Sequence, residues 1–101
     1  MRTLIRDLSD LIDSEVQIAG WVDGRRDHGK LIFLDLRDAT GKIQLVAGPE
    51  QAKTIRSEWV IEVTGKINKR PEKMVNPAEP NGNIELAVSE FKVLSQAETP
   101  P

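Results

Sequence analysis

Cysteine is absent from the sequence, and histidine occurs once, as His28. The lack of cysteine excludes a disulfide framework, a thiolate zinc site and a cysteine nucleophile, and it fits a reducing compartment. A single histidine disfavours catalytic triads built around histidine. The motifs HExxH and GxGxxG and the phosphate-binding loop are absent as well. We therefore expect neither catalytic activity nor a metal site in this stretch.

Long apolar runs are missing too. None approaches the roughly 18 residues that a transmembrane helix needs, and charged residues at 6, 7 and 10 interrupt any signal-peptide core. The 101 residues suffice for one small domain. Its formal net charge is −2, so nucleic-acid binding would depend on local basic patches and specific base contacts. Two such patches are present, one with Arg25, Arg26 and Lys30 and one with Lys66, Lys69, Arg70 and Lys73.

The segment Leu31–Asp38, LIFLDLRD, alternates with a period of two and predicts a β-strand with two unlike faces. The isoleucine and leucines at 32, 34 and 36 form an aliphatic face that must turn to the core. Phe33 then lies on the other face, together with Asp35 and Arg37. Its ring there is either a stacking surface for a base or small planar ligand, or a side chain tucked beneath a neighbouring loop or helix.

Alternation of this kind recurs along the chain, and glycines at 20 and 65 interrupt the inward series where a small barrel would bend or bulge. Short helices are expected over 3–13 and over Pro49–Ser57, and the proline-rich loop 70–83 is long enough to be functional. Five strands with a helix between the third and fourth predict an all-β OB-fold, a partly open Greek-key barrel. The alternatives are another small barrel or an open sheet with one helix. The predicted strands are Glu15–Arg26, Leu31–Asp38, Lys42–Ala47, Trp59–Lys69 and Ile84–Leu94.

Binding is favoured over catalysis by the outward residues of the second and third strands, the surface on which OB-folds bind oligonucleotides. Phe33 would stack on an unpaired base, and Gln44 carries both a donor and an acceptor with which to read a base edge. Glu85 on the last strand joins this face when the barrel closes, and Arg25 and Arg26 stand at its rim. The polar residues have simpler alternatives. Gln44 would be a solvated amide, and Glu85 would pair across strands with a lysine. Arg25 and Arg26 would belong to a solubilising turn.

The run Gly20–Val46, GWVDGRRDHGKLIFLDLRDATGKIQLV, resembles the anticodon-binding OB domain of class II aminoacyl-tRNA synthetases of the aspartate, asparagine and lysine group. Its details favour the bacterial aspartyl type. The segments KRPEKMVNP at 69–77, NIELAVSEFKVL at 83–94 and AETPP at 97–101 resemble that family as well. The resemblance therefore covers nearly the whole chain.

By this resemblance, Phe33 matches the aromatic residue that stacks on the middle anticodon uracil, and Gln44 matches the side chain that hydrogen-bonds it. Glu85 matches a glutamate facing the first anticodon base. Arg25 and Arg26 match a basic pair beside the anticodon backbone and bases. The resemblance thus implies that single-stranded RNA is read by stacking and by base-edge hydrogen bonds.

Three further positions follow from the same resemblance. Asn76 matches a loop asparagine near the last anticodon base. His28 occupies a position that, in bacterial members, bears on whether asparagine tRNA is charged besides aspartate tRNA. Histidine there favours relaxed discrimination, whereas Lys73, at the other position linked to this property, favours the opposite. The sequence leaves that question open.

The chain departs from the family in two ways. Its segment Gly48–Trp59 is short, so the helix there should be small. Residues 1–94 are expected to form the OB domain, and residues 95–101 to begin a linker toward a catalytic domain that this chain lacks. ATP and magnesium would belong to that absent domain, so the chain itself should need no cofactor and catalyse nothing.

The resemblance also implies partners and location. We expect aspartate tRNA as the partner, together with asparagine tRNA if discrimination is relaxed, and no membrane. The parent protein would be a cytoplasmic homodimer, while the isolated domain would be a monomer. The alternative function is a free-standing OB domain for general single-strand binding or for contacts with other proteins.

Overall fold

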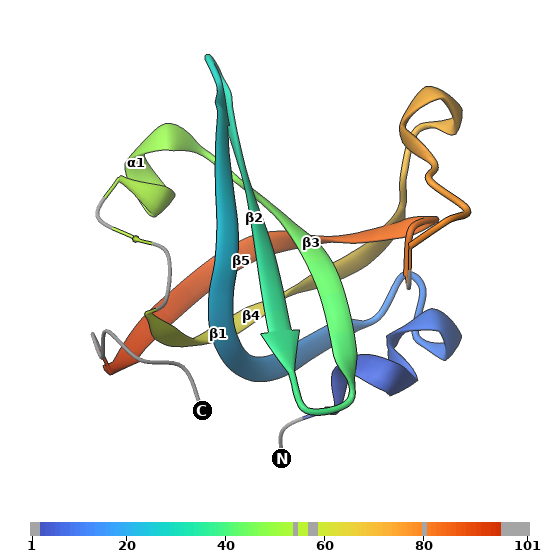
Figure 1. The fold of residues 1–101 in the computed structure, drawn as a ribbon, viewed down its shortest axis with the longest axis horizontal. Coiled ribbons are helices and arrows are strands. Elements are labelled where there is room, and N and C mark those ends of the chain that lie inside the picture. Colours follow the sequence, from blue (N-terminus) through green and yellow to red (C-terminus); the bar gives the residue numbers. More distant parts are fainter. Residues whose placement is uncertain (1–2, 54, 57–58, 80, 96–101) are drawn as a thin grey trace.

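A computed structural model describes residues 3–53, 55–56, 59–79 and 81–95 (Figure 1). Three short helices occur among them: the 3-10 helices η1 (Ile5–Asp10) and η2 (Glu72–Met74) and the helix α1 (Pro49–Ala52). The predicted all-β class, with one helix between the third and fourth strands, is confirmed. The strands are β1 (Glu15–His28), β2 (Leu31–Asp38), β3 (Gly41–Ala47), β4 (Val60–Lys69) and β5 (Ile84–Ser95).

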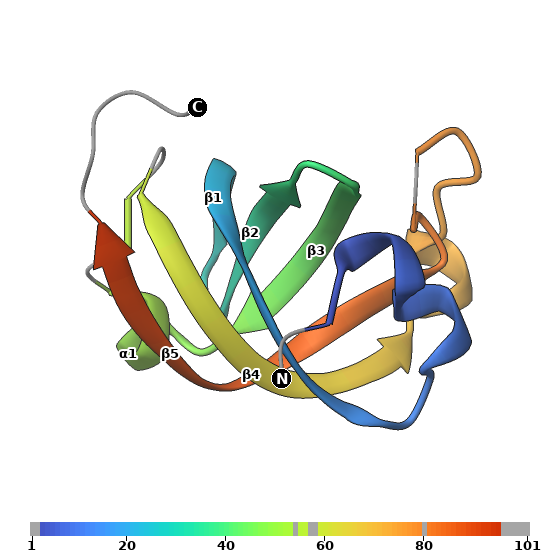
Figure 2. The same ribbon diagram turned by 90° about the horizontal axis from the view of Figure 1, so that it is seen from below.

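The five strands close into a barrel in the order β1-β2-β3-β5-β4, and β4 pairs with β1 to complete it. Neighbouring strands are antiparallel except for β3 and β5, which form a short parallel seam. Both views place η1 and α1 at opposite ends of the barrel (Figure 1, Figure 2). This closed five-stranded barrel is the predicted OB-fold and rules out the open-sheet alternative.

Aliphatic side chains from alternate strand positions fill the barrel, as the period of two predicts. Helix η1 adds Ile5 and Leu8, and both are fully buried. The sequence also predicts an inward Val88, which is only partly buried against this core. The strand residues of this core cluster are Val16, Ile18, Val22, Ile32, Leu34, Leu36, Ile43, Leu45, Ala47, Ile61, Val63, Ile67, Ile84 and Leu86.

Both helices flanking the barrel are shorter than the sequence predicts. The N-terminal one is a 3-10 helix of six residues within the predicted range 3–13, and α1 has four residues of the predicted Pro49–Ser57. At the end of α1, Nη1 of Arg25 donates to the carbonyl oxygens of Ala52 and Ile55 at 2.7 and 2.6 Å. Positions 54 and 57 of the predicted helix lie outside the described residues.

Two long strands, β1 and β4, contain a glycine where another backbone passes close by. A Cβ atom at Gly20 would collide with the Arg37 carbonyl oxygen, and one at Gly65 would collide with the Ala87 carbonyl oxygen. The pairing of β4 with β5 shifts directly before Gly65, which confirms the predicted bulge. In β1 the pairing with β2 shifts before Gly24 instead. Gly20 therefore serves a close approach and does not itself mark the bulge.

Asp38 ties the turn between β2 and β3 to helix η1. Its Oδ1 accepts the N–H groups of Thr40 and Gly41 at 2.7 and 3.0 Å and the Thr40 hydroxyl at 2.6 Å. Its Oδ2 accepts the N–H of Ile5 at 3.1 Å. Burial disfavours the ionised carboxyl, but these hydrogen bonds together outweigh it, so the pKa of Asp38 is lowered.

Replacing Asp38 by alanine is expected to lower the free energy of unfolding by about 1–3 kcal/mol, because several partly buried donors lose their acceptor. In the unaltered chain this stabilisation is present above the ordinary aspartate pKa and is lost as pH falls through the lowered pKa of the folded state. Urea unfolding across that acid range measures both effects. Asp10→Ala, at an exposed position of η1, is the control. Equal stability losses in the two variants would contradict the anchoring role.

Candidate nucleic-acid interface

The outer face of β2, β3 and β5 brings together side chains that are far apart in the sequence. Pairing of β2 with β3 places Asp35 opposite Gln44, and pairing of β1 with β2 places Arg26 opposite Phe33. The short parallel seam between β3 and β5 brings Glu85 next to Gln44. The prediction that Glu85 joins the face of Phe33 and Gln44 on closure of the barrel is therefore confirmed.

Phe33 lies on this face, outside the core of the barrel, but it is only 9% exposed. The ring of His28 packs edge-on against it, with 5.1 Å between the ring centroids. The guanidinium carbon of Arg26 lies 5.9 Å from the centroid of the Phe33 ring. Of the two alternatives for Phe33, the free domain therefore matches the covered ring, and the covering side chains come from β1. Neighbouring side chains cover the ring because exposing its apolar surface to water costs free energy.

An apolar hollow of about 250 Å³ opens beside Phe33. A water molecule takes about 30 Å³ in the liquid, so the hollow has the space of several waters and suits one planar ring. Glu85 is the one charged residue in its lining, which directs hydrogen-bond donors of a ligand to one side. Two lining residues, Pro71 and Met74, come from the loop after β4, which the sequence marks as functional without singling out either residue. The full lining is Leu31, Phe33, Val46, Pro71, Met74 and Glu85.

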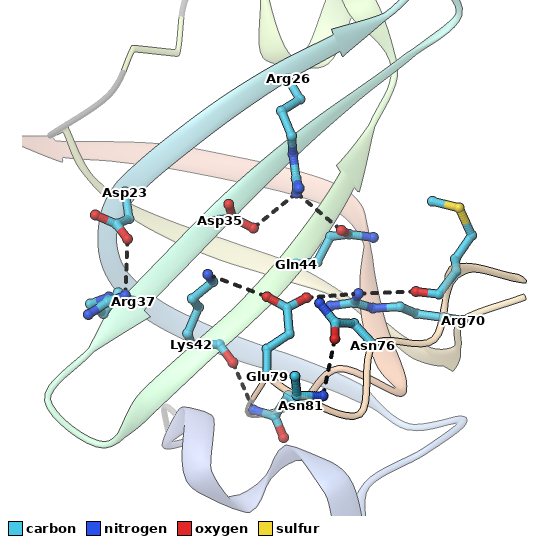
Figure 3. Close-up of polar contacts among 12 residues, drawn as sticks. Asp23, Arg26, Asp35, Arg37, Lys42, Gln44, Arg70, Asn76, Glu79 and Asn81 are labelled. Carbon is cyan, nitrogen blue, oxygen red and sulfur yellow. Dashed lines mark hydrogen bonds and ion pairs between the residues drawn. The ribbon is translucent and has the colours of Figure 1, made fainter. Parts of the chain in front are cut away.

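Gln44 is 5% exposed and is hydrogen-bonded at both ends of its amide. Nη2 of Arg26 donates to Oε1 of Gln44 at 3.1 Å and to Oδ1 of Asp35 at 3.0 Å (Figure 3). Nε2 of Gln44 donates in turn to Oε1 of Glu85 at 3.5 Å. Side chains from four strands therefore form one continuous polar chain beside the hollow.

The Glu85 carboxyl is held in a partly buried position. Burial raises the pKa of Glu85, and the attraction of Arg70 and the hydrogen bond from Gln44 offset only part of that rise. An ionised carboxylate there accepts N–H groups and repels phosphate. This end of the interface is therefore suited to base edges and not to the backbone of a nucleic acid.

Arg70 fixes the loop that forms one wall of the hollow, although the sequence placed it only in a basic patch. It is 8% exposed, and its Nε donates to the Ile84 carbonyl oxygen at 2.9 Å. Its Nη1 lies 3.2 Å from Oε1 of Glu79 and 3.4 Å from the Met74 carbonyl oxygen. Glu79 also pairs with Lys42 at 3.5 Å (Figure 3). Arg70 thus connects the start of β5, the loop and, through Glu79, β3.

The remaining predicted site residues lie around this group. Arg25 is turned to the side opposite Arg26, as successive strand residues must be, and binds the carbonyl oxygens at the end of α1. The two arginines therefore do not form one pair on one rim, contrary to the expectation from sequence. Asn76 lies in the loop after η2, where its Oδ1 accepts the N–H of Ala78 at 3.1 Å.

Polar side chains of this face are engaged with one another. In the part of the chain that the structure describes, no buried side-chain nitrogen or oxygen lacks a hydrogen-bond partner.

Among the described residues, no three His, Cys, Asp or Glu side chains come together in a way that would hold a metal ion. None of the described helices is long and apolar enough to cross a membrane.

Sequence comparisons agree with this geometry. Residues 16–94 match the tRNA anticodon family, which comprises OB-fold nucleic acid binding domains. An aspartate–tRNA(Asp/Asn) ligase from Brachyspira hyodysenteriae is 50% identical over 99 residues, covering 91% of this chain and 17% of that protein. The aspartate–tRNA ligase of Staphylococcus saprophyticus is 46% identical over 98 residues, covering 90% and 17%. The chain therefore spans about a sixth of the length of these relatives.

Solved structures share the same fold. Aspartyl-tRNA synthetase from Entamoeba histolytica superposes with a TM-score of 0.82 at 22% identity, covering 100% of this chain and 22% of that one. At this identity the likeness speaks for the fold alone. Asparaginyl-tRNA synthetase from the same organism is 33% identical with a TM-score of 0.77, covering 96% and 24%.

Proposed function

The chain belongs to the tRNA anticodon family of OB-fold nucleic acid binding domains, and from this premise we propose that it recognises the anticodon loop of aspartate tRNA. One observation carries the proposal: the apolar hollow beside Phe33 is bordered by the carboxyl of Glu85, which accepts a hydrogen bond from Gln44. A hollow with an aromatic side and convergent polar groups fits an unpaired base. The similarity to aspartate–tRNA ligases supports this choice of RNA.

The proposed mechanism reads bases that are splayed from the loop. The middle uracil stacks on Phe33 after Arg26 and His28 give way, and such stacking contributes roughly 1–3 kcal/mol per base. Gln44 hydrogen-bonds the edge of that uracil. The aspartate anticodon begins with guanine, whose N1–H and amino group both donate, and the Glu85 carboxylate accepts from them.

The proposal is tested by titrating the 101-residue chain with a synthetic anticodon stem-loop of aspartate tRNA. A second stem-loop carries adenine in place of the middle uracil. We expect roughly tenfold or greater preference for the natural loop, since a wrong base leaves buried polar groups unpaired. Equal binding of both loops with a steep salt dependence would instead establish a general single-strand binder.

Replacing Glu85 by glutamine is expected to separate binding from stability. The variant should bind the guanine-first loop about tenfold more weakly, because a charged acceptor is lost. The variant should also be at least as stable as the unaltered chain at neutral pH, because a buried charge is removed. Because the pKa of Glu85 is raised in the folded state, the contribution of the Glu85 side chain to stability is fully present below the ordinary glutamate pKa. That contribution is lost as pH rises through the raised pKa.

Affinity measurements and urea unfolding between pH 4 and neutrality, roughly the range around a carboxyl pKa, test this prediction. Glu72→Gln, at an exposed glutamate of η2, is the matched control. It should leave the affinity for the guanine-first loop unchanged. A Glu85→Gln variant that keeps full affinity for the guanine-first loop would remove Glu85 from the site.

We propose further that the chain acts as part of a longer aspartate–tRNA ligase, given that it spans 17% of each of these relatives. Such a protein would attach aspartate to tRNA in the cytoplasm, would bind ATP and magnesium outside this chain, and would form a homodimer. Aspartate and asparagine anticodons differ only in the last base, so comparison of the two stem-loops reports whether both tRNAs are bound.

A further inference from the structure

We propose that the ion pair between Lys42 and Glu79 holds the loop between β4 and β5 in the shape that receives the RNA. Both are positioning residues, and they act through the wall that this loop adds to the hollow. The inference rests on the proposed function and adds the contacts that prepare the site before the RNA arrives. Those contacts tie the loop to β3 and to the start of β5.

The loop gives the hollow an apolar wall made of Pro71 and Met74. The N–H of Met74 donates to the Pro71 carbonyl oxygen at 2.7 Å, which closes the turn between the two residues. Met74 is 44% exposed, and a base placed against its side chain would remove apolar surface from water. The position of the Met74 backbone therefore determines the shape of the hollow.

A buried arginine connects this wall to Glu79. Nη1 of Arg70 donates to the Met74 carbonyl oxygen at 3.4 Å and to Oε1 of Glu79 at 3.2 Å. Oε2 of Glu79 lies 3.5 Å from Nζ of Lys42 on β3 (Figure 3). The side chains of Lys42 and Glu79 are only 26% and 27% exposed, so water screens their attraction less than on an open surface. The Glu79 carboxylate thus bridges the arginine that holds Met74 and a lysine of the neighbouring sheet.

Two further observations support this bridge. Burial disfavours the ionised form of Glu79, but the hydrogen bond from Arg70 and the charges of Lys42 and Arg70 together outweigh it, so the pKa of Glu79 is lowered. Asn81, further along the loop, has a left-handed backbone with a φ of 56°. Its Nδ2 donates to the Lys42 carbonyl oxygen at 2.9 Å (Figure 3). Lys42 therefore contacts the loop at two points, once through its side chain and once through its backbone.

Replacing Glu79 by glutamine separates a positioning role from a simple effect of charge. RNA is a polyanion, so the loss of a carboxylate would by charge alone strengthen binding or leave it unchanged. If Glu79 holds the loop, Glu79→Gln should instead weaken binding of the aspartate anticodon stem-loop roughly threefold to tenfold, because the loop must then be ordered during binding. Glu72→Gln removes the same charge from the same loop and should not weaken binding.

Lys42→Met breaks the pair from its other side and leaves the contact between Glu79 and Arg70 in place. It should weaken binding to a similar extent as Glu79→Gln. The double variant should bind no more weakly than either single variant, since both changes remove the same contact. Independent charge effects of opposite sign would instead cancel in the double variant and restore the affinity. Lys42→Arg, which keeps a cation at this position, should retain most of the affinity.

The position of the wall can be followed without RNA. The ε-methyl signal of Met74 in NMR spectra of the free 101-residue chain should shift in Lys42→Met and in Glu79→Gln. Lys42→Arg should leave this signal close to its place in the unaltered chain. Thermal unfolding of each variant shows whether the barrel is intact at the temperature of the titrations.

The outcomes distinguish the role of the ion pair from the proposed function. If the unaltered chain binds the stem-loop and Lys42→Met and Glu79→Gln bind it equally well, the role of the pair is overturned while the proposed function stands. If the double variant regains full affinity, the two residues act through their charges and the inference fails. If the unaltered chain does not bind the stem-loop, the proposed function fails and the inference fails with it.

Discussion

Replacing Phe33 by alanine is expected to weaken binding of the anticodon stem-loop by roughly 1–3 kcal/mol, the usual contribution of one stacked base. The ring also packs against His28 and borders the hollow. Because Phe33 is only 9% exposed, the same change should lower the free energy of unfolding by about 3 kcal/mol. Both quantities follow from fluorescence anisotropy and urea unfolding of one protein preparation.

Two companion variants separate the effects of Phe33→Ala. Phe33→Leu keeps an apolar side chain of similar size, so it should retain most of the stability while losing the stacking contribution. Phe91, the other phenylalanine of the chain, lies on β5 beside Gln17 and Thr64, away from the hollow. Phe91→Ala should leave the affinity unchanged. Undiminished RNA binding by Phe33→Leu would show that the ring supports the fold and does not stack on a base.

A large effect on folding is expected from Gly65→Ala. A Cβ at this position would collide with the Ala87 carbonyl oxygen of the paired strand β5. Backbone atoms of a closed barrel have little room to move, so we expect a loss of about 3 kcal/mol or more. Small domains have total stabilities of about 5–15 kcal/mol. The variant should therefore melt far below the unaltered chain in a thermal unfolding experiment.

Gly48→Ala is the control for this prediction. Gly48 precedes α1 with an ordinary φ of −75°, and a Cβ atom at this position would lie 3.7 Å from its closest neighbour, an ordinary van der Waals contact. This substitution should change stability by less than about 1 kcal/mol. If Gly65→Ala were equally mild, the backbone contact between β4 and β5 would not be as close as the structure has it.

Much of the fold follows from alternation in the sequence. The period of two in Leu31–Asp38 and its neighbours determines which side of each strand is buried. A one-residue shift in the register of a strand would have moved its apolar side chains from the core face to the solvent face. Gly65 interrupts the inward series of its strand, and the pairing of β4 with β5 shifts at that position, so this bulge is visible in the sequence. Helix lengths were less accurate. The carbonyl oxygens at the end of α1 accept hydrogen bonds from Arg25, a residue on a distant strand, and such tertiary contacts are not visible in the local sequence.

The candidate site is only partly visible in the sequence. The side on which Phe33, Gln44 and Glu85 lie follows from strand periodicity and closure of the barrel. The residues that cover Phe33 do not follow from the sequence, because the cover depends on the conformations of the His28 and Arg26 side chains. Long polar side chains reach several positions, and local sequence does not select among them.

Arg25 and Arg70 illustrate the same limit for charged residues. In the sequence both belong to basic clusters that suggest contact with RNA. In the structure Arg25 binds carbonyl oxygens at the end of α1, and Arg70 is buried between the loop and β5. An arginine that holds backbone carbonyls has the same local sequence as one that faces solvent, so only tertiary structure separates them.

NMR titration of the 101-residue chain with the aspartate anticodon stem-loop shows whether the face around Phe33 reads the anticodon. If it does, the ring signals of Phe33, the side-chain amide of Gln44 and the carboxyl of Glu85 will shift in a saturable way. Signals around Phe91 should then change little. Saturable shifts confined to the surface around Phe91, with these three residues unmoved, would instead place the RNA elsewhere on the barrel.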